Sequence, residues 1–355
     1  MSASTTSSIP AEYGWPGGDT PGEVAFSLPA PEAARRALLP CIRQVLPEVP
    51  EDAPLLALTP PNGIVSRYKL VLPERELFVR VSIKLVHPEL EQEITGWLKR
   101  KGVAVNHVEV AGLLATHEGR VYRVDLREML NARHFNGSLE DLRQVALSVA
   151  ACHEALADFP QTNRVRRHTA SRFERLAAAG RKINAALVSG RWEDICHEPG
   201  WAGGQHEWLA RMMREWRPRL DLAPDAQCLH AQVHQGNVMY DLSDGRAILV
   251  DLEEAVQNLA SCSWDMAYLV QRFCLHDDPE EGVLRARLAV VRNAYGRRVA
   301  DLAGMMQQTS WLSMAVLVEY LGRGIVSPVA EYDKFVRLET QARERAAILE
   351  EHFGE

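Results

Sequence analysis

Residues 228–240 read CLHAQVHQGNVMY, and residues 248–255 read ILVDLEEA. The turn residues Ser243-Asp244-Gly245 lie between these two stretches, and residues of these types favour tight turns. The pattern therefore predicts a β-hairpin whose two arms are residues 237–240 and 247–251.

Two polar residues of this hairpin have the chemistry of a metal site. Asn237 begins the first arm and Asp251 ends the second arm. An amide oxygen and a carboxylate are ligands that magnesium accepts in proteins. Asp251 alone would be an ordinary strand-end carboxylate, but its spacing from Asn237 predicts that the two side chains hold one Mg²⁺ ion.

The sequence around the hairpin is mainly helical, because apolar residues recur at three- and four-residue spacing. The predicted helices are 138–158, 170–187, 205–217, 263–275, 283–303, 307–322 and 331–352. Upstream the pattern changes to short β-like runs, together with two helical stretches. These runs are 55–58, 68–72, 77–83, 108–114 and 120–126, and the helical stretches are 31–46 and 88–101. Strands followed by helices predict an α+β fold with two unequal lobes.

The composition divides the chain into three parts. Residues 1–30 are rich in Ser, Pro, Gly and Thr and have little apolar periodicity, which predicts a flexible N-terminal arm. Residues 31–127 form the predicted small β-rich N-lobe, a sheet with a helix. Residues 128–355 form the predicted larger helical C-lobe, which contains the hairpin.

The hairpin and its surroundings resemble the aminoglycoside phosphotransferase and choline kinase-like family, a branch of the protein-kinase-like superfamily. The usual string of that family is His-Gly-Asp-x-His-x-x-Asn, followed by a strand that ends in Ile/Val-Asp-x-Glu. His230, His234, Asn237 and Asp251 match this string in type and spacing. Trp264-Asp265-Met266-Ala267 matches the Tyr-Asp-Leu-Ala element that follows in the family.

The resemblance implies a two-lobed protein-kinase-like fold that binds ATP, or GTP, with Mg²⁺ and transfers the γ-phosphate to a small-molecule acceptor. Such transfer requires the protein mainly to position charges around the phosphates. The resemblance places Arg80 on the phosphates and Glu93 as the carboxylate that pairs with Arg80. It also places Gly63 and Ser66 in the turn that binds the nucleotide.

The chain departs from the family pattern at the catalytic loop. Gln232 stands where the family has its catalytic aspartate, and Ala231 stands where the family has glycine. A glutamine side chain is neutral and is not a useful proton acceptor, although it can orient an acceptor by a hydrogen bond. Gln232 and His234 are the candidate catalytic residues, with His234 as a possible base.

Three functions are compatible with this loop. The first is a kinase that works without the usual base, because proton removal contributes little early in phosphoryl transfer or because the acceptor is already ionised. The second is a pseudokinase that binds a nucleotide or another ligand without transfer. The third is different nucleotide chemistry on the same fold, such as adenylyl transfer.

The overall composition argues for a soluble globular protein. The net charge of −7 disfavours a nucleic-acid partner, since such proteins usually carry a basic excess. The six cysteines form no Cys-x-x-Cys pair and are expected to be reduced. We find no secretion signal and no apolar run long enough to cross a membrane, so a cytoplasmic protein is expected.

Overall fold

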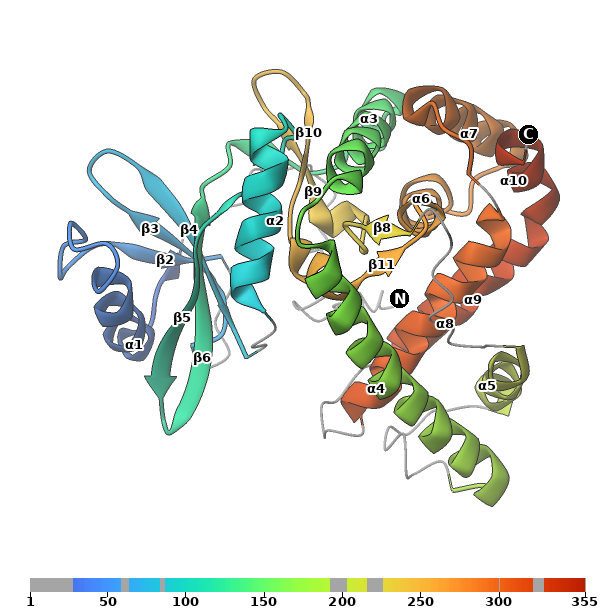
Figure 1. Ribbon diagram of the computed structural model, residues 1–355, viewed down its shortest axis with the longest axis horizontal. Coiled ribbons are helices and arrows are strands. Elements are labelled where there is room, and N and C mark those ends of the chain that lie inside the picture. Colours follow the sequence, from blue (N-terminus) through green and yellow to red (C-terminus); the bar gives the residue numbers. More distant parts are fainter. Residues whose placement is uncertain are drawn as a thin grey trace, which may run out of the picture. The chain divides into compact units, whose positions relative to one another are not determined.

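Figure 1 shows the computed structural model of the chain. It describes residues 28–58, 64–83, 87–191, 203–215, 226–299, 301–321 and 329–354. The chain forms two compact units. The first consists of Met1–Ser148 and Gln235–Glu253, and the second consists of Val149–His234 and Glu254–Glu355.

A six-stranded sheet is the centre of the first unit. Its strands lie in the order β1-β2-β3-β4-β6-β5, and each neighbouring pair is antiparallel. Their bounds are β1 Leu28–Pro29, β2 Leu55–Ala57, β3 Arg67–Val71, β4 Glu76–Ser82, β5 Val108–His117 and β6 Arg120–Glu128. Strands β2 to β6 lie where the alternation of apolar residues predicted them.

The first strand was not predicted, because it falls within the expected flexible arm. Leu28 pairs with Ala57 and Pro29 pairs with Leu56. The backbone N–H of Ala30 donates to the Leu55 carbonyl, and the Ala30 side chain is buried. The prediction of a flexible arm over residues 1–30 is therefore wrong at residues 28–30, because pairing at the edge of the sheet orders the chain there. Residues 1–27 lie outside the described residues.

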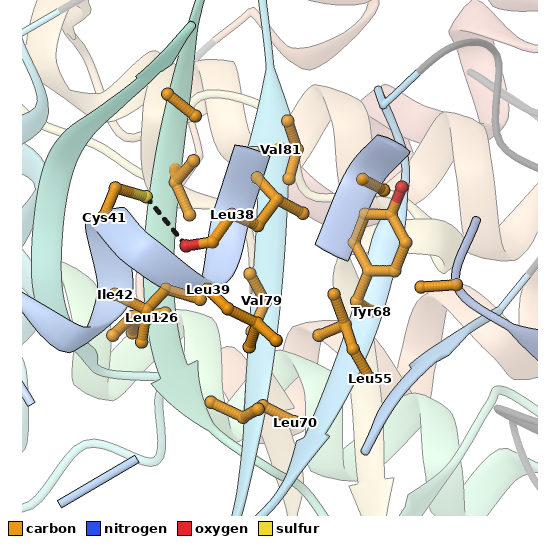
Figure 2. Packing of buried hydrophobic residues seen from close by; sticks show 14 of the residues in the cluster. Leu38, Leu39, Cys41, Ile42, Leu55, Tyr68, Leu70, Val79, Val81 and Leu126 are labelled. Atoms are coloured by element: carbon orange, nitrogen blue, oxygen red, sulfur yellow. Dashed lines mark hydrogen bonds between the residues drawn. The ribbon is translucent and has the colours of Figure 1, made fainter. Parts of the chain in front are cut away.

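Helix α1 (Glu32–Arg43) covers one face of this sheet. Its buried residues include Leu38 and Ile42, one turn apart, so they lie on the same side of the helix. Figure 2 shows these side chains against strand residues such as Val79 and Leu126, and the Cys41 thiol donates to the Leu38 carbonyl at 3.1 Å. This apolar layer is the core of the first unit.

Helix α2 (Pro88–Arg100) covers the opposite face. Pro88 occupies the start of the helix, where its missing N–H costs nothing. Gly112 of β5 lies directly beside it, because a Cβ at Gly112 would come within 2.6 Å of the proline ring. Gly112 also has φ +70, so both space and backbone conformation require glycine there.

The predicted hairpin is present in the first unit. Its strands are β9 (Val238–Asp241) and β10 (Ala247–Leu249), and β9 also pairs with the short strand β7 (Ala132–Arg133). The Asn106 N–H donates to the Leu249 carbonyl, and the Ser148 hydroxyl donates to the Ala247 carbonyl. These bonds explain why residues 235–253 belong with the sheet, whereas the sequence placed them in the helical lobe.

The second unit is mainly helical. Its helices are α4 Thr162–Ser189, α5 Gly203–Glu215, α6 Ser263–Leu269, α7 Glu281–Tyr295, α8 Leu302–Leu321, α9 Val329–Glu344 and α10 Ala346–Phe353. Helix α3 (Leu139–Ala157) spans the boundary between the units. The predicted helix 283–303 ends early, because Gly296 caps α7 at φ 68. The predicted helix 331–352 is divided at Arg345.

A two-stranded sheet also lies in the second unit and was not predicted. Strand β8 (Gln227–Cys228) pairs with β11 (Leu259–Ala260) in antiparallel orientation. These strands are too short to show an alternating pattern in the sequence. The described residues therefore form an α+β fold with one sheet-rich and one helical unit, which confirms the predicted class.

Candidate functional site

The hairpin brings the two predicted metal ligands to one end. Val238 pairs with Leu249, and the Val250 N–H donates to the Asn237 carbonyl at 3.0 Å. Asn237 ends a short 3₁₀ turn (Gln235–Asn237) and is 7% exposed, and Asp251 follows the second strand with φ 60. Asn237 and Asp251 therefore flank the open end of the same hairpin.

Arg80 of β4 reaches the same place. Its Nη1 donates to Asp251 Oδ1 at 2.6 Å, and its Nη2 donates to Glu253 Oε2 at 2.8 Å. Burial disfavours the charged guanidinium, but the negative charges of Asp251 and Glu253 outweigh burial and hold the pKa of Arg80 well above its usual value. The arginine is thus a permanent cation beside the predicted metal ligand.

Glu91 of α2 is the carboxylate that the sequence analysis missed. It is fully buried and accepts hydrogen bonds from Arg123 and Arg127 of β6. Burial alone would raise the pKa of Glu91, but the charges of Arg127, Arg80 and Arg123 lower it below its usual value. The helical pattern could have found Glu91, because it shares the buried face of α2 with Leu90, Ile94 and Leu98.

The predicted partner of Arg80 was Glu93, and this assignment is revised. Arg80 donates to Asp251 and Glu253 instead. Glu93 is half-buried and lies two residues beyond Glu91, about 200° around the helix. The structure therefore gives Arg80 two partners that the motif did not name, and Glu93 lies on a different side of α2 from Glu91.

The predicted nucleotide-binding turn is described only in part. Gly63 lies outside the described residues. Ser66 is half-buried and immediately precedes β3, where its carbonyl accepts a hydrogen bond from the Val81 N–H at 3.0 Å. Ser66 is therefore joined to β4 one residue beyond Arg80, and its contact with a nucleotide stays a prediction.

The loop with the candidate catalytic residues lies in the second unit and is held by Asp265 of α6. Asp265 Oδ2 accepts the His230 N–H at 2.9 Å, and Oδ1 accepts the Ala231 N–H at 2.7 Å. The Trp264 indole donates to the Ala231 carbonyl at 3.1 Å. Ala231 has φ 78, a left-handed conformation that glycine adopts more readily. The loop thus keeps the backbone conformation of a glycine although it carries alanine.

A buried histidine completes this anchor. His153 Nε2 lies 3.1 Å from Asp265 Oδ2, and His153 Nδ1 lies 2.9 Å from the Tyr295 hydroxyl. Burial opposes the charged imidazole, but the hydrogen bond to Asp265 outweighs it and raises the pKa of His153 to about 9. Asp265 therefore faces a cation as well as two backbone donors.

Gln232 and His234 alternate with the fully buried Val233 along the loop. Gln232 and His234 are both half-buried. The His234 N–H donates to the Gln232 carbonyl at 3.0 Å. Their roles at an acceptor stay predictions.

The donor chemistry of the hairpin fits a hard divalent cation. Asn237 offers an amide oxygen and Asp251 a carboxylate, and such ions bind oxygen ligands. Across the described residues, no three side chains of His, Cys, Asp or Glu form a metal-binding group. The site would therefore be a sparse one, of the kind that magnesium completes with phosphate oxygens and water.

The described helices include none that is both long and apolar enough to cross a membrane. Among the described residues, Cys41, Cys152, Cys228, Cys262 and Cys274 are free thiols, and Cys196 lies outside the described residues.

The sheet-rich unit with its hairpin and the helical unit with its loop indicate the class of kinase-like phosphotransferases. A sequence profile described as the phosphotransferase enzyme family matches residues 58–310. The chain belongs to this family. The match confirms the family that the motifs indicated and the enzyme class that follows from it.

Solved structures share the fold at low sequence identity. Amicoumacin kinase hAmiN, in complex with AMP-PNP, Ca²⁺ and Ami, has a TM-score of 0.52 at 11% identity, over 88% of this chain and 96% of that chain. Choline kinase LicA from Streptococcus pneumoniae has a TM-score of 0.52 at 14% identity, over 84% and 98%. Spectinomycin phosphotransferase APH(9)-Ia, in complex with ADP and spectinomycin, has a TM-score of 0.50 at 13% identity, over 81% and 93%. The comparison with curated proteins gave no match.

Proposed function

We propose that this protein transfers the γ-phosphate of ATP or GTP to a small-molecule acceptor. The observation that carries the proposal is the double ion pair of Arg80 with Asp251 and Glu253. It keeps a fixed cation beside the carboxylate that is suited to a metal, which is the charge arrangement that a nucleotide triphosphate with its metal requires.

Each residue then has a defined role. Arg80 binds phosphate oxygens, for which its planar fork of donors is suited. Asn237 and Asp251 hold Mg²⁺, which when bound neutralises charge on the phosphates. Glu253 keeps the Arg80 guanidinium in place, and Ser66 and Gly63 line the nucleotide.

The similar structures support the choice of ligands. One was solved with AMP-PNP, Ca²⁺ and Ami, and another with ADP and spectinomycin. Both pair an adenine nucleotide with a small molecule. We therefore infer the same ligand classes here, without inferring either of those two acceptors.

Gln232 sets the chemistry of the acceptor step. A neutral amide can orient an acceptor hydroxyl but cannot take its proton. Transfer then needs His234 as the base or an acceptor that is already ionised, such as a carboxylate or phosphate. The same neutral residue supports the second candidate function, a nucleotide-binding pseudokinase, or an adenylyl transferase.

Thermal unfolding with Mg-ATP, Mg-GTP and Mg²⁺ alone tests nucleotide binding. We expect at least one nucleotide to raise the melting temperature, since a ligand that binds the folded state stabilises it. Asp251→Asn should remove most of this shift. Asp244→Asn, in the exposed turn of the same hairpin, should leave it intact. A wild-type protein that neither nucleotide stabilises would refute the proposal.

Single-turnover assays then separate a transferase from a pseudokinase. Phosphate release or phosphorylated product above the level of the Asp251→Asn variant supports γ-phosphate transfer, whereas release of pyrophosphate indicates adenylyl transfer. Gln232→Asp should increase release if the loop lacks only its base. Binding without any product would support the pseudokinase.

A further inference from the structure

One face of the first sheet is charged although it is buried. Residues alternate along β6, so Val124 and Leu126 join the apolar layer under α1. Arg123, Asp125 and Arg127 point to the opposite face, toward α2, and each is at most 2% exposed. Arg80 lies on this charged face, because it pairs in register with Asp125.

Glu91 enters this face from α2, where each of its two oxygens accepts a hydrogen bond from one arginine. Its Oε2 accepts from Arg123 Nη2 at 2.5 Å, and its Oε1 accepts from Arg127 Nη2. Arg123 is held in turn, because its Nε donates to Asp125 Oδ1 at 2.8 Å. Both oxygens of Glu91 are therefore committed to β6.

Arg80 interacts with the Glu91 carboxylate through charge and not through a hydrogen bond. The charge of Glu91 acts on Arg80, and the charge of Arg80 acts on Glu91. The hydrogen bonds of Arg80 instead go to Asp251 and Glu253. Arg80 thus interacts through charge with the carboxylates of its own face and forms hydrogen bonds with Asp251 and Glu253.

We propose that Arg123 and Arg127 are positioning residues for Arg80: by occupying both oxygens of Glu91, they leave the Arg80 guanidinium to Asp251 and Glu253. This inference rests on the proposed function, since it treats Arg80 as the cation that binds the nucleotide.

The physical reason is competition for a planar cation. The two terminal nitrogens of Arg80 donate to Asp251 and Glu253, and a rotation of the guanidinium that turned them toward Glu91 would break these contacts. An oxygen of Glu91 that loses Arg127 is a buried anion without its donor, and such a group is costly. Arg80 is the nearby cation that can satisfy it, at the expense of Asp251 and Glu253.

The test compares a single variant with a double variant that also removes the competing anion. Arg127→Met frees Glu91 Oε1 and should weaken binding of Mg-AMP-PNP about tenfold, measured by calorimetry. Arg127→Met/Glu91→Gln removes the competing anion as well, and binding should return to within about threefold of wild type. Arg120→Met, an exposed arginine on the same strand, should bind as wild type does.

Thermal unfolding of the same variants without nucleotide separates positioning from a structural role, because a structural role alone would make the loss of affinity follow the loss of stability. Equal weakening in both variants, or none in either, would overturn the inference while leaving nucleotide binding by the wild type intact. A wild type that does not bind would overturn the proposed function and this inference together. If Arg127→Met does not fold, Arg123→Met with and without Glu91→Gln makes the same comparison, because Arg123 is the donor to the other oxygen of Glu91.

Discussion

Arg80 and Asp251 are separated by 171 residues of sequence, yet the Arg80 Nη1 donates to Asp251 Oδ1 at 2.6 Å. The contact joins the fourth strand of the sheet to the open end of the hairpin. Asp251 therefore carries a cation in the position where the proposed function requires a metal and phosphates. Under the proposed function, metal and nucleotide share this pair, so we expect the two binding events to depend on each other.

Removal of Arg80 should move metal and nucleotide affinities in opposite directions. Arg80→Met leaves the Asp251 and Glu253 carboxylates without their guanidinium, so a divalent cation alone should bind about tenfold more tightly. Mg-AMP-PNP should bind about tenfold more weakly, because the phosphates lose a cation. Mn²⁺ titration by electron paramagnetic resonance and calorimetry measure the two affinities.

The matched control for this variant is Arg36→Met, whose side chain is 77% exposed on α1. Both affinities should equal those of wild type in the control. If both affinities fall together in Arg80→Met, metal and nucleotide do not share the Arg80–Asp251 pair in the way described.

Ala231→Gly should stabilise the protein. Ala231 has φ 78, and a left-handed conformation costs a residue with a Cβ about 1–2 kcal/mol. Glycine loses part of this gain through its more flexible unfolded chain, so we expect a net gain of about 0.5–1 kcal/mol. Urea unfolding measures the difference.

Ala151→Gly provides the comparison, because Ala151 is exposed within α3. There the same change should cost about 1 kcal/mol. Destabilisation of similar size at both positions would show that Ala231 is not strained.

Asp265→Asn should destabilise the loop anchor strongly. The carboxylate accepts two backbone N–H groups and faces His153, and it is fully buried. An amide keeps the shape but loses the charge and one acceptor, so we expect a loss of about 3 kcal/mol in the free energy of unfolding. Asp244→Asn, half-exposed in the hairpin turn, should change it by less than about 0.5 kcal/mol. Equal losses in the free energy of unfolding in the two variants would contradict the role of Asp265 as the anchor of the loop.

The free energy of unfolding should fall as the pH rises above 6.5. The pKa of His153 is raised to about 9 from an unfolded value of 6.5, so its stabilisation is complete below pH 6.5 and is lost as the pH rises through 9. Between pH 6.5 and 8.5 we expect a loss of about 2 kcal/mol. Urea unfolding at several pH values measures the slope.

His153→Gln should remove this slope. The groups that face His153 are Asp265, Tyr295 and Cys262. Burial raises the pKa of Tyr295 and so keeps that hydroxyl neutral in this window. Burial and the charge of Arg67 lower the pKa of His134 to about 4. The titration of His134 therefore changes the free energy of unfolding only below pH 6.5. A stability that stays flat from pH 6.5 to 8.5 would show that His153 is neutral.

The strands and the hairpin were predictable because their signal is local. Alternation along β4 and β6 and the turn at 243–245 specify which residues face the same way, whatever the rest of the chain does. The α+β class followed from the order of strands and helices, and the family motif added the loop at 230–237 and the kinase-like fold. The short strands β1, β7, β8 and β11 were missed, since a strand of two residues has no period to detect.

The spacing of Asn237 and Asp251 was sufficient by itself to place both residues at one end of a hairpin, because a hairpin is formed by neighbouring residues. Only the tertiary structure decided that Arg80 bonds to Asp251 and Glu253, and that Glu91 rather than Glu93 enters the charged face. These pairings join segments far apart in the chain, and they depend on the register of β4 with β6 and on the rotation of α2. Neither quantity is a property of any local stretch of sequence.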